Sequence, residues 1–211
     1  MDIDMLLYDG FDELDGIGPY EVFDYALGYA SEADGRAGRV RYVTLAEREA
    51  VTASHGTRVG IDGVLPEPDG ETAPDLLVVP GGGWNARDED ASAWAEAQQG
   101  DVPQALAAYH AAGTRIASVC TGSMLLAEAG VTDGRRAVTH ADAVDELRES
   151  GAEVVDARVV DDGDLLTAGG VTSGLDLALY IVEREFGAAI ADRVATVIEY
   201  ERRYEVAADA E

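Results

Sequence analysis

Short apolar runs alternate with longer amphipathic segments along the chain. Runs of about four to eight apolar, partly β-branched residues predict buried strands, and apolar positions three and four apart predict helices. Strands are expected at residues 3–8, 39–46, 76–79, 116–119, 154–160 and 165–167. Helices are expected at 20–27, with Pro19 in the first turn, and at 88–99, 102–112, 124–129, 142–150, 175–186 and about 188–201. This alternation predicts an α/β fold, a three-layer sandwich around a mostly parallel sheet.

Nothing along the 211 residues marks a boundary between domains. Residues 51–65 carry Gly, Thr and Val in short alternating pieces, which predicts a hairpin or an edge excursion. We find no internal repeat and no linker. We therefore expect one domain over residues 1–211, with a frayed tail from about residue 206.

The single cysteine, Cys120, lies where the strand at 116–119 gives way to the helix at 124–129. Its neighbours Ser118 and Gly122 are small, as a tight strand-to-helix turn requires, and this arrangement is typical of a nucleophile elbow. The N-terminus of the following helix favours a thiolate there. The alternative is a buried structural thiol, since free cysteine is among the most buried residue types. The elbow context favours the nucleophile.

The charge balance is strongly acidic. The chain has 42 acidic and 15 basic residues, a formal net charge of −27, and every basic residue is arginine. Such a surface repels itself in dilute buffer, whereas molar salt shortens the screening length to roughly 3 Å. Because the acids are spread along the chain, we expect a cytoplasmic protein of an extreme halophile. The same charge argues against binding to nucleic acid or to an anionic membrane.

Cysteine usage and hydropathy exclude further classes. One cysteine permits no internal disulfide and no cysteine-based zinc site, and no His/carboxylate spacing suggests a catalytic metal. We expect no cofactor. The N-terminus has no basic segment typical of a signal peptide, and the apolar runs are far shorter than the ~20 residues of a membrane span.

Three features are expected at the carboxyl ends of the parallel strands, where open α/β sheets bind ligands. The first is Cys120. The second is the loop at 80–83, in which three glycines allow close backbone approach to a substrate. The third is Asp15, which follows apolar Leu14 and precedes a glycine turn, so that its side chain is positioned to turn inward.

Five segments, in order, resemble the ThiJ/PfpI superfamily, which shares the flavodoxin-like fold of class I glutamine amidotransferases. They are residues 14–23 (LDGIGPYEVF), 75–83 (DLLVVPGGG), 117–127 (ASVCTGSMLLA), 133–140 (DGRRAVTH) and 165–178 (LLTAGGVTSGLDLA). Within the superfamily, the combination of LDGIGP and VCTG is most similar to the isonitrile hydratase branch. The chain also resembles the amidotransferase-like sensor domains of AraC-type regulators.

The resemblance implies roles for the matched positions. Cys120 is the implied nucleophile, Asp15 the acid beside its sulfur, and Thr121 an assisting residue. Gly82, Gly83 and the backbone at Cys120 or Thr121 are implied to form an oxyanion-type or substrate-binding pocket. Two anions in contact cannot both ionise cheaply, so we expect a neutral Asp15 carboxyl beside a Cys120 thiolate. The resemblance also implies a homodimer.

The chain departs from the superfamily at two positions. Protease-like and glyoxalase-like branches have a histidine directly after the cysteine, where this chain has Thr121, so a Cys–His dyad of that kind is not expected. His140 matches a histidine that relatives usually follow with tryptophan, but Ala141 follows it here. His140 either lines the pocket or completes a strand end.

We carry three hypotheses for function. The first is an enzyme that adds water to a small electrophilic carbon such as an isonitrile, with glyoxalase or deglycase chemistry as a variant. The second is a redox or electrophile sensor based on Cys120. The third is a ligand-sensing module, which a helix-turn-helix segment would favour; no such segment is expected before Glu211.

Overall fold

The computed structural model describes residues 1–87, 90–202 and 206–208. Within them, eight strands form one sheet in the order β12-β10-β11-β7-β6-β1-β2-β5. All pairs in it are parallel except β10 with β11, which confirms the mostly parallel sheet. The strands are β1 (Asp2–Leu6), β2 (Arg39–Thr44), β5 (Gly63–Val64), β6 (Leu76–Val79), β7 (Arg115–Val119), β10 (Val159–Asp162), β11 (Leu165–Ala168) and β12 (Val206–Ala207).

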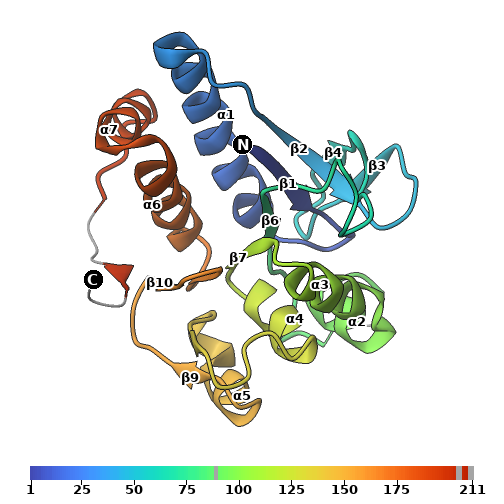
Figure 1. The fold of residues 1–211 in the computed structure, drawn as a ribbon. Helices are drawn as coiled ribbons and strands as arrows, with labels where there is room; N and C mark the ends of the chain where they lie inside the picture. Colours follow the sequence, from blue (N-terminus) through green and yellow to red (C-terminus); the bar gives the residue numbers. More distant parts are fainter. Residues whose placement is uncertain (88–89, 203–205, 209–211) are drawn as a thin grey trace.

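Helices cover both faces of this sheet (Figure 1). One face packs against α1 (Glu13–Asp34), α6 (Ser173–Phe186) and α7 (Ala188–Val197). The other packs against α2 (Ala93–Gln99), α3 (Asp101–Ala111), α4 (Gly122–Glu128) and α5 (Val144–Glu149), which follows a 3₁₀ turn at Ala141–Ala143. Side chains alternate between the two cores along each strand, as in β6, because successive residues of a strand point to opposite faces. The three-layer architecture is confirmed.

Two small sheets lie outside the main one. The predicted hairpin in 51–65 is present as β3 (Ala50–Thr52) and β4 (Arg58–Gly60), which pair antiparallel. The strand predicted at 154–160 is divided into β9 (Glu153–Val154), which pairs with β8 (Arg136–Ala137), and β10. This division carries the chain from the small sheet to the edge of the main one.

The first helix begins earlier than its sequence predicts. Pro19 is the seventh residue of α1 and not part of its first turn, because Asp12 caps the helix by accepting the Leu14 N–H at 3.2 Å. The glycines inside α1 permit close packing: a Cβ on Gly16 would lie 2.7 Å from the Phe11 ring. Close packing outweighs the low helix propensity of glycine and proline here.

Three other boundaries differ from the prediction. Helix α2 begins at Ala93, because Ser92 caps it, and the predicted start at 88 lies outside the described residues. Helix α7 ends at Val197 and not at residue 201, because Glu199 takes a left-handed φ of 50° and the chain turns there. Val206 and Ala207 pair with β10, so these two residues form a strand where a frayed tail was expected.

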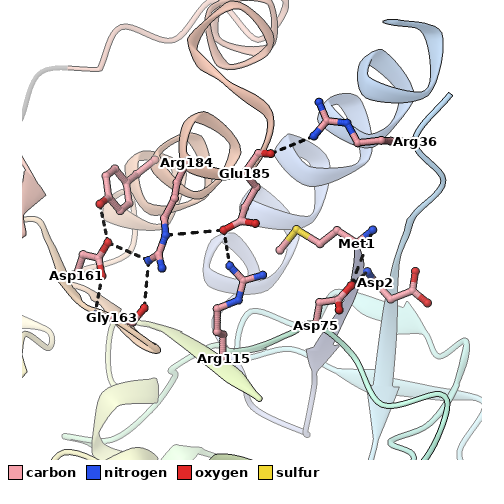
Figure 2. A network of polar contacts seen from close by, with 10 residues as sticks. Met1, Asp2, Arg36, Asp75, Arg115, Asp161, Gly163, Arg184 and Glu185 are labelled. Carbon is pink, nitrogen blue, oxygen red and sulfur yellow. Dashed lines mark hydrogen bonds and ion pairs between the residues drawn. The ribbon is translucent and has the colours of Figure 1, made fainter. Parts of the chain in front are cut away.

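The amino edge of the sheet carries a network of arginines and carboxylates (Figure 2). Arg184 bonds the Asp161 carboxylate at 3.0 Å and the Gly163 carbonyl at 3.1 Å. Arg115, at the start of β7, pairs with Glu185 at the end of α6. These contacts fix the C-terminal end of α6 to the beginnings of the strands.

No helix among the described residues combines the length and the apolar character that a membrane crossing requires.

Candidate active site

Cys120 occupies the sharp bend between β7 and α4, with a left-handed φ of 57° that non-glycine residues rarely adopt. Its N–H donates to the carbonyl oxygens of Ala168 at 3.0 Å and Gly169 at 2.9 Å, and its own carbonyl accepts from the Thr139 hydroxyl at 3.0 Å. These bonds hold the strained backbone in place. The tight strand-to-helix turn predicted around Cys120 is present.

Glycines allow the loops around the elbow to approach one another. A Cβ on Gly81 would lie 2.4 Å from the Thr121 nitrogen, and one on Gly122 would lie 2.3 Å from the Val79 carbonyl oxygen. Real Cβ atoms do not tolerate such contacts, so both positions require glycine. The loop after β6 is thereby pressed directly against the turn that carries Cys120.

A pocket of about 200 Å³ opens above Cys120. It is built at the carboxyl ends of the parallel strands, by the segments that follow β1, β6, β7 and β11, and by His140 in the segment that follows β8. Its walls bring together five of the six residues predicted from the sequence; Asp15 is fully buried and is not among the wall residues. The described walls are Asp12, Gly82, Gly83, Trp84, Asn85, Ala86, Cys120, Thr121, His140 and Val171.

Asp15 turns inward, as the sequence predicts, and has no exposed surface. Its Oδ2 accepts the Gly81 N–H at 3.1 Å, and its Oδ1 has no hydrogen-bond partner among the described residues. Burial, followed by the negative charge of Asp12, raises the pKa of Asp15 well above its usual range, although the Gly81 N–H and the Cys120 thiol lower it in part. Asp15 is therefore a buried carboxyl with an affinity for a proton.

The surroundings of Cys120 oppose the thiolate that the sequence leads us to expect. Burial, and then the charge of Asp15, raises the pKa of Cys120 to about 12. The backbone N–H groups of Val171 and Thr121 act in the opposite direction, but they are the weaker influence. Removing the sulfur from water outweighs the helix N-terminus, so the Cys120–Asp15 pair holds at least one proton at neutral pH.

Thr121 and Gly82 contact each other across the pocket. The Gly82 N–H donates to Thr121 Oγ1 at 3.0 Å, which leaves the hydroxyl proton of Thr121 available to the pocket. The Gly82 N–H and the Cys120 N–H both have protein acceptors, so neither is the free oxyanion donor that the resemblance implies. The N–H groups of Thr121 and Val171, which act on the sulfur, are better placed for that task.

His140 lines the pocket, which was one of its two predicted placements. Its Nδ1 accepts the Asp142 N–H at 3.2 Å, so the neutral ring carries its proton on Nε2. The ring packs over Gly170, where an added Cβ would lie 3.0 Å from Cδ2. His140 is thus a pocket residue whose Nε2–H can donate a hydrogen bond.

The sequence reasoning did not find Asp12, Val171 or Tyr8 as parts of the site. Asp12 lines the pocket. Val171 has a left-handed φ of 24°, which the preceding glycine pair could have signalled. The buried Tyr8 hydroxyl donates to the Pro80 carbonyl at 2.7 Å, and burial, followed by the Asp15 charge, raises its pKa well above the usual range. This hydrogen bond from Tyr8 holds the loop after β6 in place.

No group of three or more His, Cys, Asp or Glu side chains in the described part of the chain is arranged to hold a metal ion.

Similarity to known proteins identifies the family of this chain. The family model for DJ-1/PfpI matches residues 1–184. The chain belongs to the DJ-1/PfpI family. A ThiJ/PfpI family protein from Pseudomonas syringae has the same fold, with a TM-score of 0.79 and 27% identity over 96% of this chain and 76% of that one.

Several characterised proteins of this family are similar in sequence. An isonitrile hydratase from Pseudomonas putida is 34% identical over 205 residues, which cover 95% of this chain and 78% of that protein. A deglycase from Pyrococcus horikoshii is 31% identical over 79% of this chain and 92% of that protein. The HTH-type transcriptional regulator CdhR of Pseudomonas aeruginosa is 33% identical over 73% of this chain but only 43% of the regulator. Proteins named as enzymes and as a regulator are thus similar to this chain at comparable identity.

Proposed function

We propose that this DJ-1/PfpI protein adds water to an isonitrile, R–N≡C, and releases the N-substituted formamide. The observation that carries the proposal is the pair formed by Cys120, at a strained elbow below a small pocket, and the buried Asp15, whose Oδ1 has no hydrogen-bond partner among the described residues. A nucleophile and a proton-binding acid in contact are the groups that this addition requires. Similarity to an isonitrile hydratase over most of the chain supports the same reaction.

The reaction proceeds in two steps. The Cys120–Asp15 pair starts with one shared proton; Sγ of Cys120 attacks the terminal carbon while that proton is delivered through the Asp15 carboxyl group to the same carbon, which gives the covalent thioimidate R–N=CH–S–Cys. Water then adds to the thioimidate carbon, and the C–S bond breaks. The products are R–NH–CHO and the regenerated thiol, so every proton is accounted for and no oxidant or reductant is needed.

The surrounding residues serve this chemistry. The Thr121 hydroxyl, held as a donor by the Gly82 N–H, is placed to position the substrate nitrogen or the attacking water. The N–H groups of Thr121 and Val171 stabilise negative charge that develops at sulfur. The pocket volume of about 200 Å³ suits a compact substrate.

The test is turnover of a panel of alkyl and aryl isonitriles by the purified protein in molar KCl, with the formamide measured by mass spectrometry. We expect a trapped adduct on Cys120 and no product from Cys120→Ala. The matched control is Ser118→Ala, which removes a neighbouring buried hydroxyl that bonds Ser123 and not the pocket. Formamide production by the Cys120→Ala variant would refute the proposal.

A second candidate is addition of the same thiol to an aldehyde carbon, as in a deglycase or glyoxalase. The position of His140 in the pocket favours it, because Nε2–H is a donor suited to a carbonyl oxygen. The same panel should therefore include glyoxals, and the ratio of the two turnover rates separates the candidates. Redox sensing is less favoured, since a pKa of about 12 leaves little thiolate at neutral pH.

We also infer a cytoplasmic homodimer working at high salt. The net charge of −27 supports the high-salt setting, because repulsion at the surface falls when the screening length is short. Sedimentation tests the dimer, and thermal unfolding across a series of KCl concentrations tests the high-salt setting. A monomer at every salt concentration would contradict the dimer, and equal thermal stability across the series would contradict the halophilic setting.

A further inference from the structure

The described wall of the active-site pocket contains an acidic side chain and no basic arginine. Among the ten described residues that line it, Asp12 supplies a carboxylate and none is an arginine. Cys120 forms part of the pocket wall and the fully buried Asp15 lies beside it; this pair also carries negative charge whenever it gives up a proton. An approaching ligand therefore meets acidic groups both at the entrance and at the base of the pocket.

The Asp12 carboxylate is held in place and does not swing freely into solvent. Its Oδ1 accepts the Leu14 N–H at 3.2 Å as the cap of α1, and the Asp12 N–H donates to the Gly81 carbonyl at 2.8 Å. The next residue, Glu13, accepts the His55 N–H at 3.0 Å and so fixes the hairpin loop beside it. The His55 imidazole Nε2 lies 3.8 Å from Asp12 Oδ2 at this entrance.

The charge of Asp12 reaches the reacting groups. It contributes to the raised pKa of both Asp15 and Cys120, which shows that the three groups interact across the pocket. The same field acts on any charged group of a substrate that occupies the space between them. Because Asp15 and Cys120 are buried, their interaction with Asp12 is screened less by salt than interactions between charges on the open surface are.

We propose that Asp12 determines the charge class of the substrate: the pocket admits neutral or cationic electrophiles and excludes those that carry a carboxylate or phosphate. The inference rests on the proposed function for the nature of the electrophile. It concerns the discrimination between charge classes, which can be measured at Cys120 whether or not an isonitrile is turned over.

The test compares alkylation of Cys120 by iodoacetamide and by iodoacetate, which have nearly the same shape but differ by one negative charge. In both cases the sulfur displaces iodide and a C–S bond forms, so the ratio of the two rates reports access by charge and cancels any change in thiolate content. The measurement is made by mass spectrometry at pH 9 in molar KCl, where the repulsion from the rest of the surface is screened.

The variant is Asp12→Asn, which can still cap α1 through its amide oxygen. The control is Asp24→Asn, which removes the same charge from an exposed position of α1 away from the pocket. We expect the iodoacetate-to-iodoacetamide ratio to rise on the order of tenfold in Asp12→Asn and to stay unchanged in Asp24→Asn. Asp12→Ser, another capping residue, should behave like Asp12→Asn.

Equal ratios in the wild type, Asp12→Asn and Asp24→Asn would overturn the proposal. So would failure of both reagents to reach Cys120 in the folded protein, because Asp12 would then border no open path to the sulfur. A matched pair of isonitriles, methyl isocyanoacetate and isocyanoacetate, extends the test to turnover. If neither is hydrated while the alkylation ratio shifts as expected, the isonitrile function fails and the role of Asp12 stands.

Discussion

Two buried carboxylates have opposite surroundings. One lies at the amino ends of the parallel strands (the amino edge) and the other at their carboxyl ends (the carboxyl edge). At the amino edge, Asp161 Oδ2 accepts the Tyr180 hydroxyl at 2.6 Å and Arg184 at 3.0 Å, while its Oδ1 accepts the Gly163 N–H at 2.8 Å (Figure 2). At the carboxyl edge, Asp15 Oδ2 accepts the Gly81 N–H at 3.1 Å, and Oδ1 has no hydrogen-bond partner among the described residues.

The difference distinguishes a carboxylate that stabilises the fold from one that is suited to catalysis. A buried carboxylate whose oxygens all have donors is stable as an anion and fastens the elements that supply those donors. A buried carboxylate without a cation favours its protonated form, and a group that readily exchanges a proton beside a nucleophile is suited to catalysis. The amino edge therefore holds the fold together, while the carboxyl edge keeps a reactive pair.

The largest effect should distinguish the two acids by activity. Asp15→Asn removes the group that carries the proton between sulfur and substrate, so kcat should fall by roughly 10²–10⁴-fold. Asp161→Asn should leave kcat within a few-fold of the wild type, because the amino edge does not touch the pocket. Steady-state turnover of the best isonitrile or glyoxal checks both, with a circular dichroism spectrum of each variant to confirm folding. Equal losses in the two variants would remove the distinction.

The second effect is on the ionisation of the sulfur. Because the pKa of Cys120 is raised to about 12, its rate of reaction with iodoacetamide should keep increasing up to tenfold per pH unit between pH 8 and 10. Free cysteine, with an ordinary pKa, levels off over that range. Asp15→Asn removes the neighbouring negative charge and should shift the profile to lower pH. A wild-type profile that levels off as free cysteine does would contradict the raised pKa.

The third effect concerns stability, and its sign should be opposite at the two edges. Asp161→Asn leaves Arg184 and the Tyr180 hydroxyl with a poorer acceptor, so the free energy of unfolding should fall by about 1–3 kcal/mol. Asp15 has a folded-state pKa above its unfolded value, so its stabilising contribution is complete below the unfolded pKa and is lost as pH rises through the folded pKa.

Asp15→Asn should therefore become more stable than the wild type as pH increases from acid toward neutral and beyond. Urea unfolding at a series of pH values, at constant KCl, measures both variants together. If Asp15→Asn were destabilised at every pH by as much as Asp161→Asn, Asp15 would be a structural anchor.

The sequence was sufficient for those parts of the molecule that depend on local pattern. Apolar runs located the central strands, and the small residues around Cys120 identified the elbow, because a left-handed bend tolerates only such neighbours. The placement of Asp15 followed from an apolar residue before it and a glycine after it. These are short-range constraints, which a sequence displays directly.

The properties that the sequence did not reveal depend on distant contacts. The start of α1 depends on packing of its glycines against Phe11, and the short strand at Val206 depends on an edge offered by β10. The thiolate expected at Cys120 rested on the local helix N-terminus, whereas burial by segments far apart in the chain raises the pKa of Cys120. In the sequence, nothing distinguishes Asp12 from the other acidic residues. Its place in the pocket wall depends on the folded structure.

The smallest effect tests whether the carboxyl edge stores backbone strain for the sake of its chemistry. Cys120 has a φ of 57°, which costs a non-glycine residue about 1–2 kcal/mol and costs glycine almost nothing. Cys120→Gly should therefore unfold at a higher urea concentration than Cys120→Ala, by roughly 1 kcal/mol in the free energy of unfolding, although both lack the nucleophile. The matched comparison at an ordinary position is Ala117→Gly against the wild type, where loss of a buried methyl group in β7 should destabilise. If glycine were no better than alanine at position 120, the bend would carry no strain, and the reactivity of this edge would rest on the unpaired acid alone.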